Sequence, residues 1–178
     1  MIAIDKYSES VIINYSIHTN KVGNKDKGWC IEMKMSTKGR YALRLMLDLA
    51  IYNTGEPIAL KDIAKRQKIS EKYLEQIISL LSKAGYVKSV RGPFGGYKLK
   101  MTPKEYTVSM ILSKAEGDLN IVNREDELED DASTARATCK VWEQMSQALQ
   151  TVADHITLAD MVEWQREADL ELSYQYNI

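Results

Sequence analysis

Between residues 60 and 100 the hydrophobic period of the chain changes from helical to alternating. Apolar residues first recur every three or four positions in two short segments, which Gln67-Lys68-Ile69 separates. After Gly85 the pattern alternates in two short runs that flank a glycine-rich loop. The first period is typical of amphipathic helices and the second of strands in a hairpin. The segment therefore predicts two short helices, a tight turn and a two-stranded β-hairpin.

A further helix is predicted upstream. Ser36 or Thr37 offers the side-chain oxygen that an N-cap requires, and an apolar face follows at helical spacing. Two short helices, a tight break and a hairpin are the plan of a winged helix-turn-helix, whose second helix enters a DNA major groove about 12 Å wide. Lys68 stands at the turn position where glycine is common. The apolar face consists of Ala42, Leu45, Met46 and Leu49.

The second half of the chain also predicts helices. Thr107 is expected to cap a helix that runs to about Glu116, and a polar, acidic loop follows it. A long helix is expected from about Ala135, and a short last helix from Thr157 to about Arg166. The predicted fold class is mainly α, with a two-stranded wing and a long C-terminal helix. One side of the long helix carries Val141, Met145, Ala148, Leu149 and Val152.

Charge divides the chain into parts of opposite sign. Residues 33–104 carry 15 Lys and Arg against 5 Asp and Glu, whereas residues 105–178 carry 5 against 16. The net charge of the whole chain, −1, hides this division. A basic segment followed by an acidic one indicates that the first meets a polyanion and that the second has another role. We therefore predict a winged-helix DNA-binding region at 33–104 and a helical dimerisation and regulatory region at 105–178.

Residues 1–32 share neither the charge bias nor the helical spacing. They carry four Lys and Arg against four Asp and Glu, and the polar stretch 20–28 contains two glycines. The apolar run 11–13 is too short for a signal peptide and lacks its flanking residues. The expectation is a disordered extension or a start-site artefact, with the natural start at Met33 or Met35.

The winged-helix pattern places candidate DNA contacts at three points. Lys34, Lys38 and Arg40, with free N–H groups at the front of the first helix, are expected to hold a phosphate. Polar residues after Ser70 are expected to face the major groove, and the glycine-rich loop brings Arg91 and the backbone close to DNA. The predicted contacts are Ser36, Thr37, Lys38, Arg40, Ser70, Lys72, Tyr73, Glu75, Gln76, Arg91, Gly92, Gly95, Gly96 and Tyr97.

A set of short motifs occurs in fixed order through this region. They are Ser36-Thr37-Lys38-Gly39-Arg40-Tyr41-Ala42-Leu43, Ile69-Ser70, Tyr73-Leu74-Glu75-Gln76, Ala84-Gly85-Tyr86-Val87, Arg91-Gly92-Pro93 and Gly95-Gly96-Tyr97. Together they resemble the Rrf2 family of bacterial transcription regulators. The resemblance implies a homodimer joined through the long helix at about 135–155. It also implies that Lys72, Tyr73, Glu75 and Gln76 lie in the major groove and Arg91 in the wing contact.

Many members of this family hold an iron–sulfur cluster through three cysteines in the loop before the long helix. Here the loop from Gly117 to Ala135 contains no cysteine, and Arg136 stands where the last ligand is expected. The chain has two cysteines, Cys30 and Cys139. Of these only Cys139 is near the loop, one turn after it, and a single thiolate cannot hold a cluster that usually needs three or four protein ligands. We therefore expect no cofactor.

The resemblance is nearest to the cluster-free, CymR-like branch, whose members repress genes of cysteine and sulfur metabolism. The tail at 174–178 looks like the aromatic tail of that branch. The resemblance implies a repressor with double-stranded DNA, a second copy and cysteine synthase as partners. Two alternatives remain. Cys139 is either a thiol redox sensor or a packed small side chain, and the winged helix either binds DNA or contacts another protein.

Other functions are disfavoured by the residue types. No apolar run approaches the roughly 18 residues of a membrane span, and two cysteines fit a reducing, cytoplasmic setting. The chain shows no HExxH, phosphate-loop or nucleophile-elbow pattern, so we do not expect an enzyme. The acidic run 125–131 is interpreted as solvated surface rather than a metal site.

Overall fold

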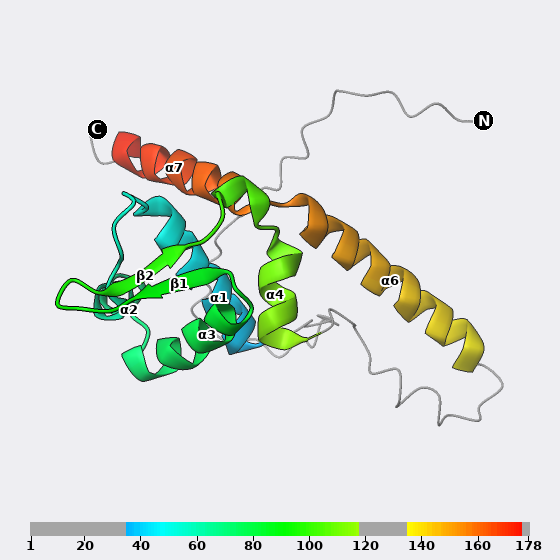
Figure 1. The fold of residues 1–178 in the computed structure, drawn as a ribbon. Coiled ribbons are helices and arrows are strands. Elements are labelled where there is room, and N and C mark those ends of the chain that lie inside the picture. The colour runs from blue at the N-terminus through cyan, green and yellow to red at the C-terminus, as the bar shows by residue number, and fades with distance from the viewer. Residues whose placement is uncertain (1–34, 118–134, 176–178) are drawn as a thin grey trace, which may run out of the picture. The chain divides into compact units, whose positions relative to one another are not determined.

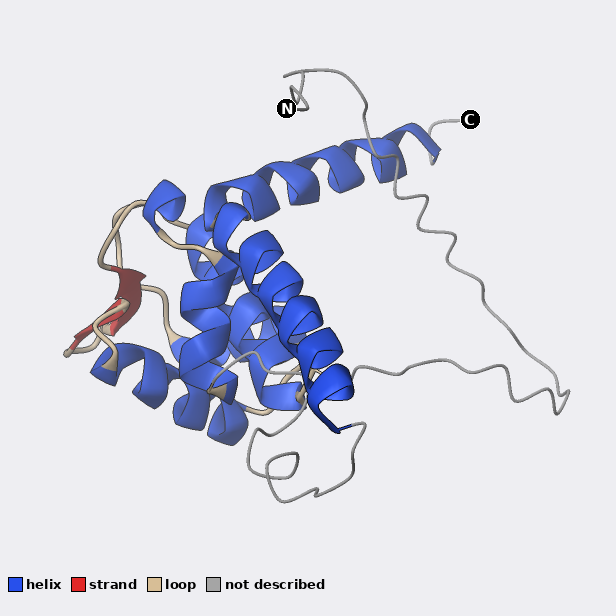
Figure 2. Ribbon diagram, turned by 90° about the vertical axis from the view of Figure 1, so that its right-hand side faces the viewer, coloured by secondary structure: helices blue, strands red, loops and turns tan. Residues whose placement is uncertain are grey.

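The computed structural model describes residues 35–117 and 135–175 (Figure 1). The predictions for residues 1–32 and for most of the acidic loop lie outside the described residues. Figure 2 shows that helices dominate and that the strands form one small hairpin, which confirms the predicted fold class. The elements are α1 (Thr37–Ile51), α2 (Leu60–Gln67), α3 (Glu71–Lys83), β1 (Val87–Val90), β2 (Gly96–Leu99), the 3₁₀-helix η1 (Pro103–Glu105), α4 (Val108–Glu116), α6 (Ala135–His155) and α7 (Leu158–Gln175).

The core forms around α1, which packs against α2, α3, α4 and α7. Its predicted apolar face is buried, and Leu74 of α3 and Ile63 of α2 pack in the same cluster. Tyr106, Ile111 and Leu158 complete the cluster from the second half of the chain. Residues on both sides of position 104 therefore share one core.

The turn between α2 and α3 is left-handed at Lys68. Its φ of 53° and ψ of 42° lie in a region that non-glycine residues seldom adopt. The Lys68 N–H still bonds to the Ala64 carbonyl, and the Ile69 N–H bonds to the same carbonyl at 3.1 Å. Ser70 is the N-cap of α3 as predicted, but its side chain makes no capping hydrogen bond. Lys68 thus ends α2 at the position where glycine was expected.

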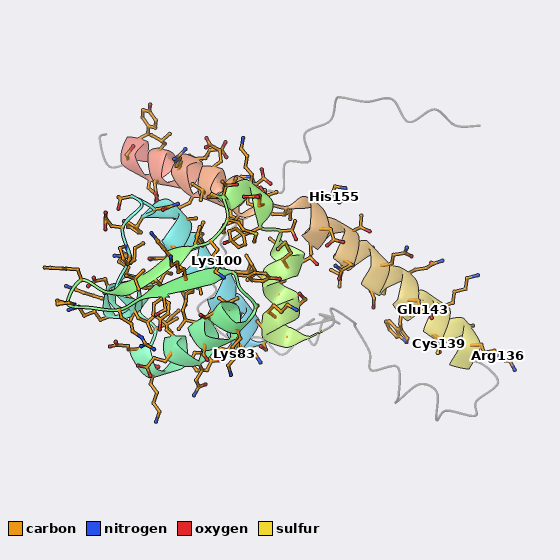
Figure 3. All side chains as sticks on the ribbon, viewed as in Figure 1. Lys83, Lys100, Arg136, Cys139, Glu143 and His155 are labelled. Atoms are coloured by element: carbon orange, nitrogen blue, oxygen red, sulfur yellow. The ribbon has the colours of Figure 1, made fainter. Side chains whose placement is uncertain are left out.

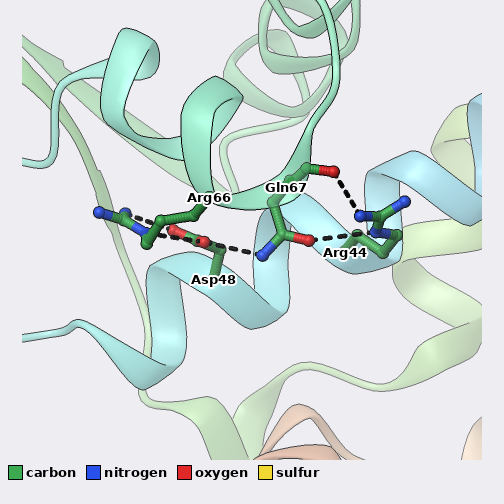
Figure 4. A network of polar contacts seen from close by, with 4 residues as sticks. All are labelled: Arg44, Asp48, Arg66 and Gln67. Carbon is green, nitrogen blue, oxygen red and sulfur yellow. Dashed lines mark hydrogen bonds and ion pairs between the residues drawn. The ribbon is translucent and has the colours of Figure 1, made fainter.

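A polar network holds α2 against α1 (Figure 4). The fully buried Asp48 carboxylate accepts hydrogen bonds from Arg66 at 2.6 and 3.0 Å and from the Gln67 side chain at 2.8 Å. Arg44 donates to the Gln67 side-chain oxygen at 3.1 Å and to its main-chain carbonyl at 2.5 Å. The latter bond satisfies a carbonyl at the end of α2 that has no helical partner. The hydrogen bond to Asp48 raises the pKa of Arg66 above its ordinary value.

The wing consists of β1 and β2, which pair antiparallel with Val87 opposite Leu99 and Val90 opposite Gly96. Ile58, just before α2, adds a bridge on the other edge of β2. Its N–H bonds to the Tyr97 carbonyl at 2.9 Å, and the Tyr97 N–H bonds to the Ile58 carbonyl at 2.8 Å. The wing is therefore tied directly to the start of α2.

The last helix of the chain, α7, is longer than predicted. Instead of ending near Arg166, α7 continues to Gln175. Residues 167–175 contain neither glycine nor proline, and their Ala, Glu and Leu residues favour helix. Because no stop signal follows Arg166, the expected end was wrong. Within 35–117 and 135–175, no helix combines the length and the apolar character needed to cross a bilayer.

Candidate nucleic-acid interface

The start of α3 and the wing line one groove of about 400 Å³. Glu75 of α3 and Arg91 of the wing loop both face it, so the fold joins two predicted contacts from separate segments. Lys61 of α2 also lines the groove, although it was not among the predicted contacts. The other lining residues are Ala59, Leu60, Glu71, Ser89, Val90, Gly92, Gly95, Gly96 and Tyr97.

One face of α3 is exposed and the other is buried, as a helix that packs on the core and faces a DNA groove requires. Lys72, Glu75 and Gln76 are exposed, whereas the opposite face of the helix is buried in the core. Tyr73 is only half-buried, and its ring meets the Tyr41 ring edge-on with 5.7 Å between centroids. Tyr73 therefore also packs α3 against α1, and its contact with DNA stays a prediction.

The glycines of the wing have different surroundings. A Cβ on Gly95 would lie 2.5 Å from the Val90 carbonyl oxygen, and a Cβ on Gly96 would overlap the Ile58 carbonyl. Gly92 has a φ of +123° and open space where a Cβ would stand. Gly95 and Gly96 thus let the chain approach itself, and a close approach of DNA to them stays a prediction.

Phe94 was missed by the sequence reasoning. It lies in the loop between β1 and β2, and 92% of it is exposed. Apolar side chains that proteins insert between base steps come from such exposed positions. The signal available in the sequence was that the single Phe of the chain stands in a glycine-rich loop.

The N-terminus of α1 already holds a carboxylate of the chain itself. The Ser36 hydroxyl oxygen accepts hydrogen bonds from the N–H groups of Lys38 and Gly39, at 3.1 and 3.3 Å. Glu116, the last residue of α4, accepts from the Gly39 N–H at 2.7 Å and from the Ser36 hydroxyl. The prediction of free N–H groups here was wrong for these two amides. Arg40 is exposed, so its side chain remains a predicted phosphate contact.

We expect Gly39→Ala to change the free energy of unfolding by no more than about 1 kcal/mol. The added Cβ would overlap only the end of the Glu116 side chain, which can turn away. Alanine favours a helix over glycine by about 0.5–1 kcal/mol, which offsets much of the lost hydrogen bond. Urea unfolding of both proteins measures the difference, and a loss above about 2 kcal/mol would show that the end of α4 cannot move.

Cys139 and His155 lie on α6 (Figure 3), and neither of them lines the groove. Cys30 and the acidic run 125–131 lie outside the described residues. Cys139 is half-buried between Arg136 and Glu143 along α6. His155, at its end, has its Nδ1 atom 2.6 Å from the Thr151 carbonyl oxygen. In the described parts of the chain, no three His, Cys, Asp or Glu side chains gather as metal ligands would. A redox role of Cys139 stays a prediction.

The predicted apolar stripe of α6 is largely exposed in the single chain. Val141, Leu149 and Val152 are 51%, 36% and 58% exposed. The helix contacts α4, where the Gln150 side chain donates to the Ser109 hydroxyl at 2.5 Å. The side of α6 that carries the stripe is therefore not covered by the described elements.

Comparison with known proteins gives a consistent result. Residues 35–164 match the family model Rrf2, described as iron-dependent transcriptional regulator. IscR of Aliivibrio salmonicida is 38% identical over 130 residues, which are 73% of this chain and 77% of that protein. The structure of CymR, the global cysteine regulator of Bacillus subtilis, is 38% identical with a TM-score of 0.64, covering 74% of this chain and 97% of CymR. The structure of T. potens IscR is 44% identical with a TM-score of 0.64, covering 76% and 90%.

Proposed function

The chain belongs to the Rrf2 family of transcriptional regulators, and from this premise we propose that it represses transcription by binding operator DNA as a homodimer. The observation that carries the proposal is the groove that α3 and the wing share. Glu71 and Glu75 of α3 and Arg91 of the wing line it. Lys72 and Gln76, which follow these glutamates in the sequence, are exposed on the same helix. The basic balance of residues 33–104 supplies attraction to phosphates.

The exposed stripe of α6 supports the homodimer. Large apolar side chains on one side of a helix are usually covered in an interface, and most symmetric assemblies are twofold dimers. A dimer through α6 presents two α3 helices to major grooves about 34 Å apart, or multiples of that spacing, on a partly palindromic site. The two-stranded wings then contact the flanking backbone or minor groove.

The donor set of the chain does not fit an iron–sulfur cluster. Such clusters are held mainly by three or four cysteine thiolates. The chain has only Cys30 and Cys139, and residues 117–135 contain no cysteine. We therefore place the protein with cytoplasmic, cluster-free regulators of the CymR type, acting on cysteine or sulfur metabolism with cysteine synthase as a candidate partner. The similarity to CymR supports this placement, and thiol oxidation at Cys139 is the alternative signal.

The test is a selection of random DNA duplexes on the full chain, followed by fluorescence anisotropy across a salt series. We expect a partly palindromic duplex to be enriched, with affinity that falls steeply between about 50 and 200 mM salt. A protein-binding winged helix would enrich no duplex and show only weak, salt-labile binding. If no duplex is enriched even after cysteine synthase is added, the result would favour a winged helix that contacts another protein.

Two substitutions locate the contacts on the enriched duplex. Gln76→Ala is expected to weaken binding by about 1–3 kcal/mol and to relax the base preference at one position. Arg91→Ala is expected to weaken binding by a similar amount and, if Arg91 meets a phosphate, to lower the salt slope by about 1. Arg166→Ala is the matched control, because Arg166 is an exposed arginine on α7. Unchanged affinity for both test variants would contradict the assigned interface.

A further inference from the structure

Tyr106 occupies a central position below the wing. It follows η1, and its side chain is fully buried. Its hydroxyl accepts hydrogen bonds from the N–H groups of Lys100 and Met101 at 3.0 and 2.9 Å, and it donates to the Tyr86 carbonyl at 2.6 Å. A phenol has one donor and two acceptor sites, so this hydroxyl is fully used. Because Tyr86 precedes β1 and Lys100 follows β2, one side-chain atom joins the chain where it enters and leaves the wing.

The same residue is tied to the junction of α6 and α7. The Tyr106 carbonyl accepts the Leu158 N–H at 2.9 Å, and the Val108 N–H bonds to the Ile156 carbonyl at 2.9 Å. Between these bonds Thr107 pairs with Thr157 in an antiparallel bridge. The Tyr106 ring also meets the Tyr86 ring edge-on, with 6.0 Å between centroids. Tyr106 therefore links the junction of α6 and α7 to the base of the wing.

A hairpin of this size needs such anchors. Each strand has four residues, and an isolated two-stranded hairpin is at best marginally stable in water. The loop end of the wing carries exposed Phe94 and Arg91. In the described structure the hairpin is held at its side by the Ile58 bridge and at its base by Tyr106. Burial raises the pKa of the Tyr106 hydroxyl further above neutral pH than that of an ordinary tyrosine, so loss of the donated proton is made still less favourable.

We propose that Tyr106 is a positioning residue for DNA binding: its hydroxyl fixes the base of the wing to the α6–α7 junction and thereby places Arg91 opposite α3. The proposal rests on the proposed DNA-binding function, because Arg91 matters only if the wing meets DNA. It assigns Tyr106 no contact with DNA.

The first test uses hydrogen exchange on the full chain without DNA. The Met101 amide lies outside β2, and within residues 35–117 and 135–175 its one hydrogen-bond acceptor is the Tyr106 hydroxyl. In the wild type we expect it to be protected, and in Tyr106→Phe we expect exchange at least about tenfold faster, while Ile77 of α3 keeps its rate. Phenylalanine keeps the buried ring, so the fold is retained.

Tyr86→Phe is the matched control for this test. It removes a hydroxyl from the other ring of the pair, and no hydrogen bond of that hydroxyl is present among the described residues. We expect the Met101 amide to keep its wild-type rate in this variant. An unprotected Met101 amide in the wild type, or an unchanged rate in Tyr106→Phe, would overturn the proposal.

The second test is a double-mutant cycle on the enriched duplex. Tyr106→Phe is expected to weaken binding about tenfold, and Arg91→Ala is expected to weaken it less in the Tyr106→Phe background than in the wild type. A residue that only stabilises the fold would give additive effects, which would overturn the positioning role. If the wild type binds no duplex, the proposed function fails, while the exchange measurement still decides whether Tyr106 holds the wing.

Discussion

Arg66→Met is expected to lower the free energy of unfolding by about 3–5 kcal/mol. The Asp48 carboxylate is fully buried, and Arg66 supplies two of its three hydrogen bonds. Without the guanidinium, a carboxylate remains in the core with only the Gln67 amide as partner. Arg66 itself is partly exposed, but its removal leaves the buried Asp48 charge without its counter-ion. That is far more damaging than breaking a pair with two exposed members, because the remaining charge has lost its hydration.

Urea unfolding monitored by circular dichroism measures this loss. Arg44→Met is the matched control, because Arg44 is exposed and contacts Gln67 rather than the carboxylate. We expect it to lower stability by less than about 1 kcal/mol. The double variant Asp48→Leu, Arg66→Met is expected to recover most of the stability, since no buried charge remains. A single Arg66→Met protein as stable as the wild type would show that Asp48 does not depend on this partner.

Gly96→Ala is expected to lower the free energy of unfolding by about 1–3 kcal/mol and to weaken operator binding at least tenfold. The added Cβ would overlap the Ile58 carbonyl and lie 2.8 Å from the Ala59 nitrogen. Both are backbone atoms, so no side chain can rotate to make room. The chain must separate at the bridge between Ile58 and Tyr97, which loses two backbone hydrogen bonds.

Amide exchange at Ile58 and Tyr97, together with urea unfolding, measures this effect. Gly39→Ala is the control, because its Cβ meets only the flexible end of Glu116. Equal stability of the two alanine variants would contradict the distinction between backbone and side-chain contacts. Unchanged operator binding by Gly96→Ala would show that the position of the wing does not matter for binding.

The helices and the wing could be predicted because their signals are local. Ser36 and Thr107 have the side chains that cap helices, and Gly85, where the period changes, follows the end of α3 with a φ of +80°. The end of α7 was missed because the sequence gives no stop signal there. The Asp48 network was missed because its partners lie 18 and 19 residues away. One local signal existed, since Asp48 falls directly beside Leu49 on a face that is otherwise apolar.

The candidate site was predicted in part for the same reason. The exposed residues of α3 follow from its helical period, and Arg91 follows from the loop between two strands. That Glu75 and Arg91 line one groove depends on how the wing packs, which local patterns do not contain. The Glu116 carboxylate at the start of α1 comes from 77 residues further along the chain than Gly39. Tertiary packing alone brings these groups together.

The paired glycines of the wing bear on how such regulators are searched for. Gly95 and Gly96 are explained by contacts with Val90 and Ile58, inside the protein. A sequence pattern that contains this glycine pair therefore identifies the hairpin, not DNA binding. It would also match proteins that have the same hairpin but no longer bind nucleic acid. The residue that bears on function is the exposed Arg91 at the start of the same loop, which the hairpin itself does not require.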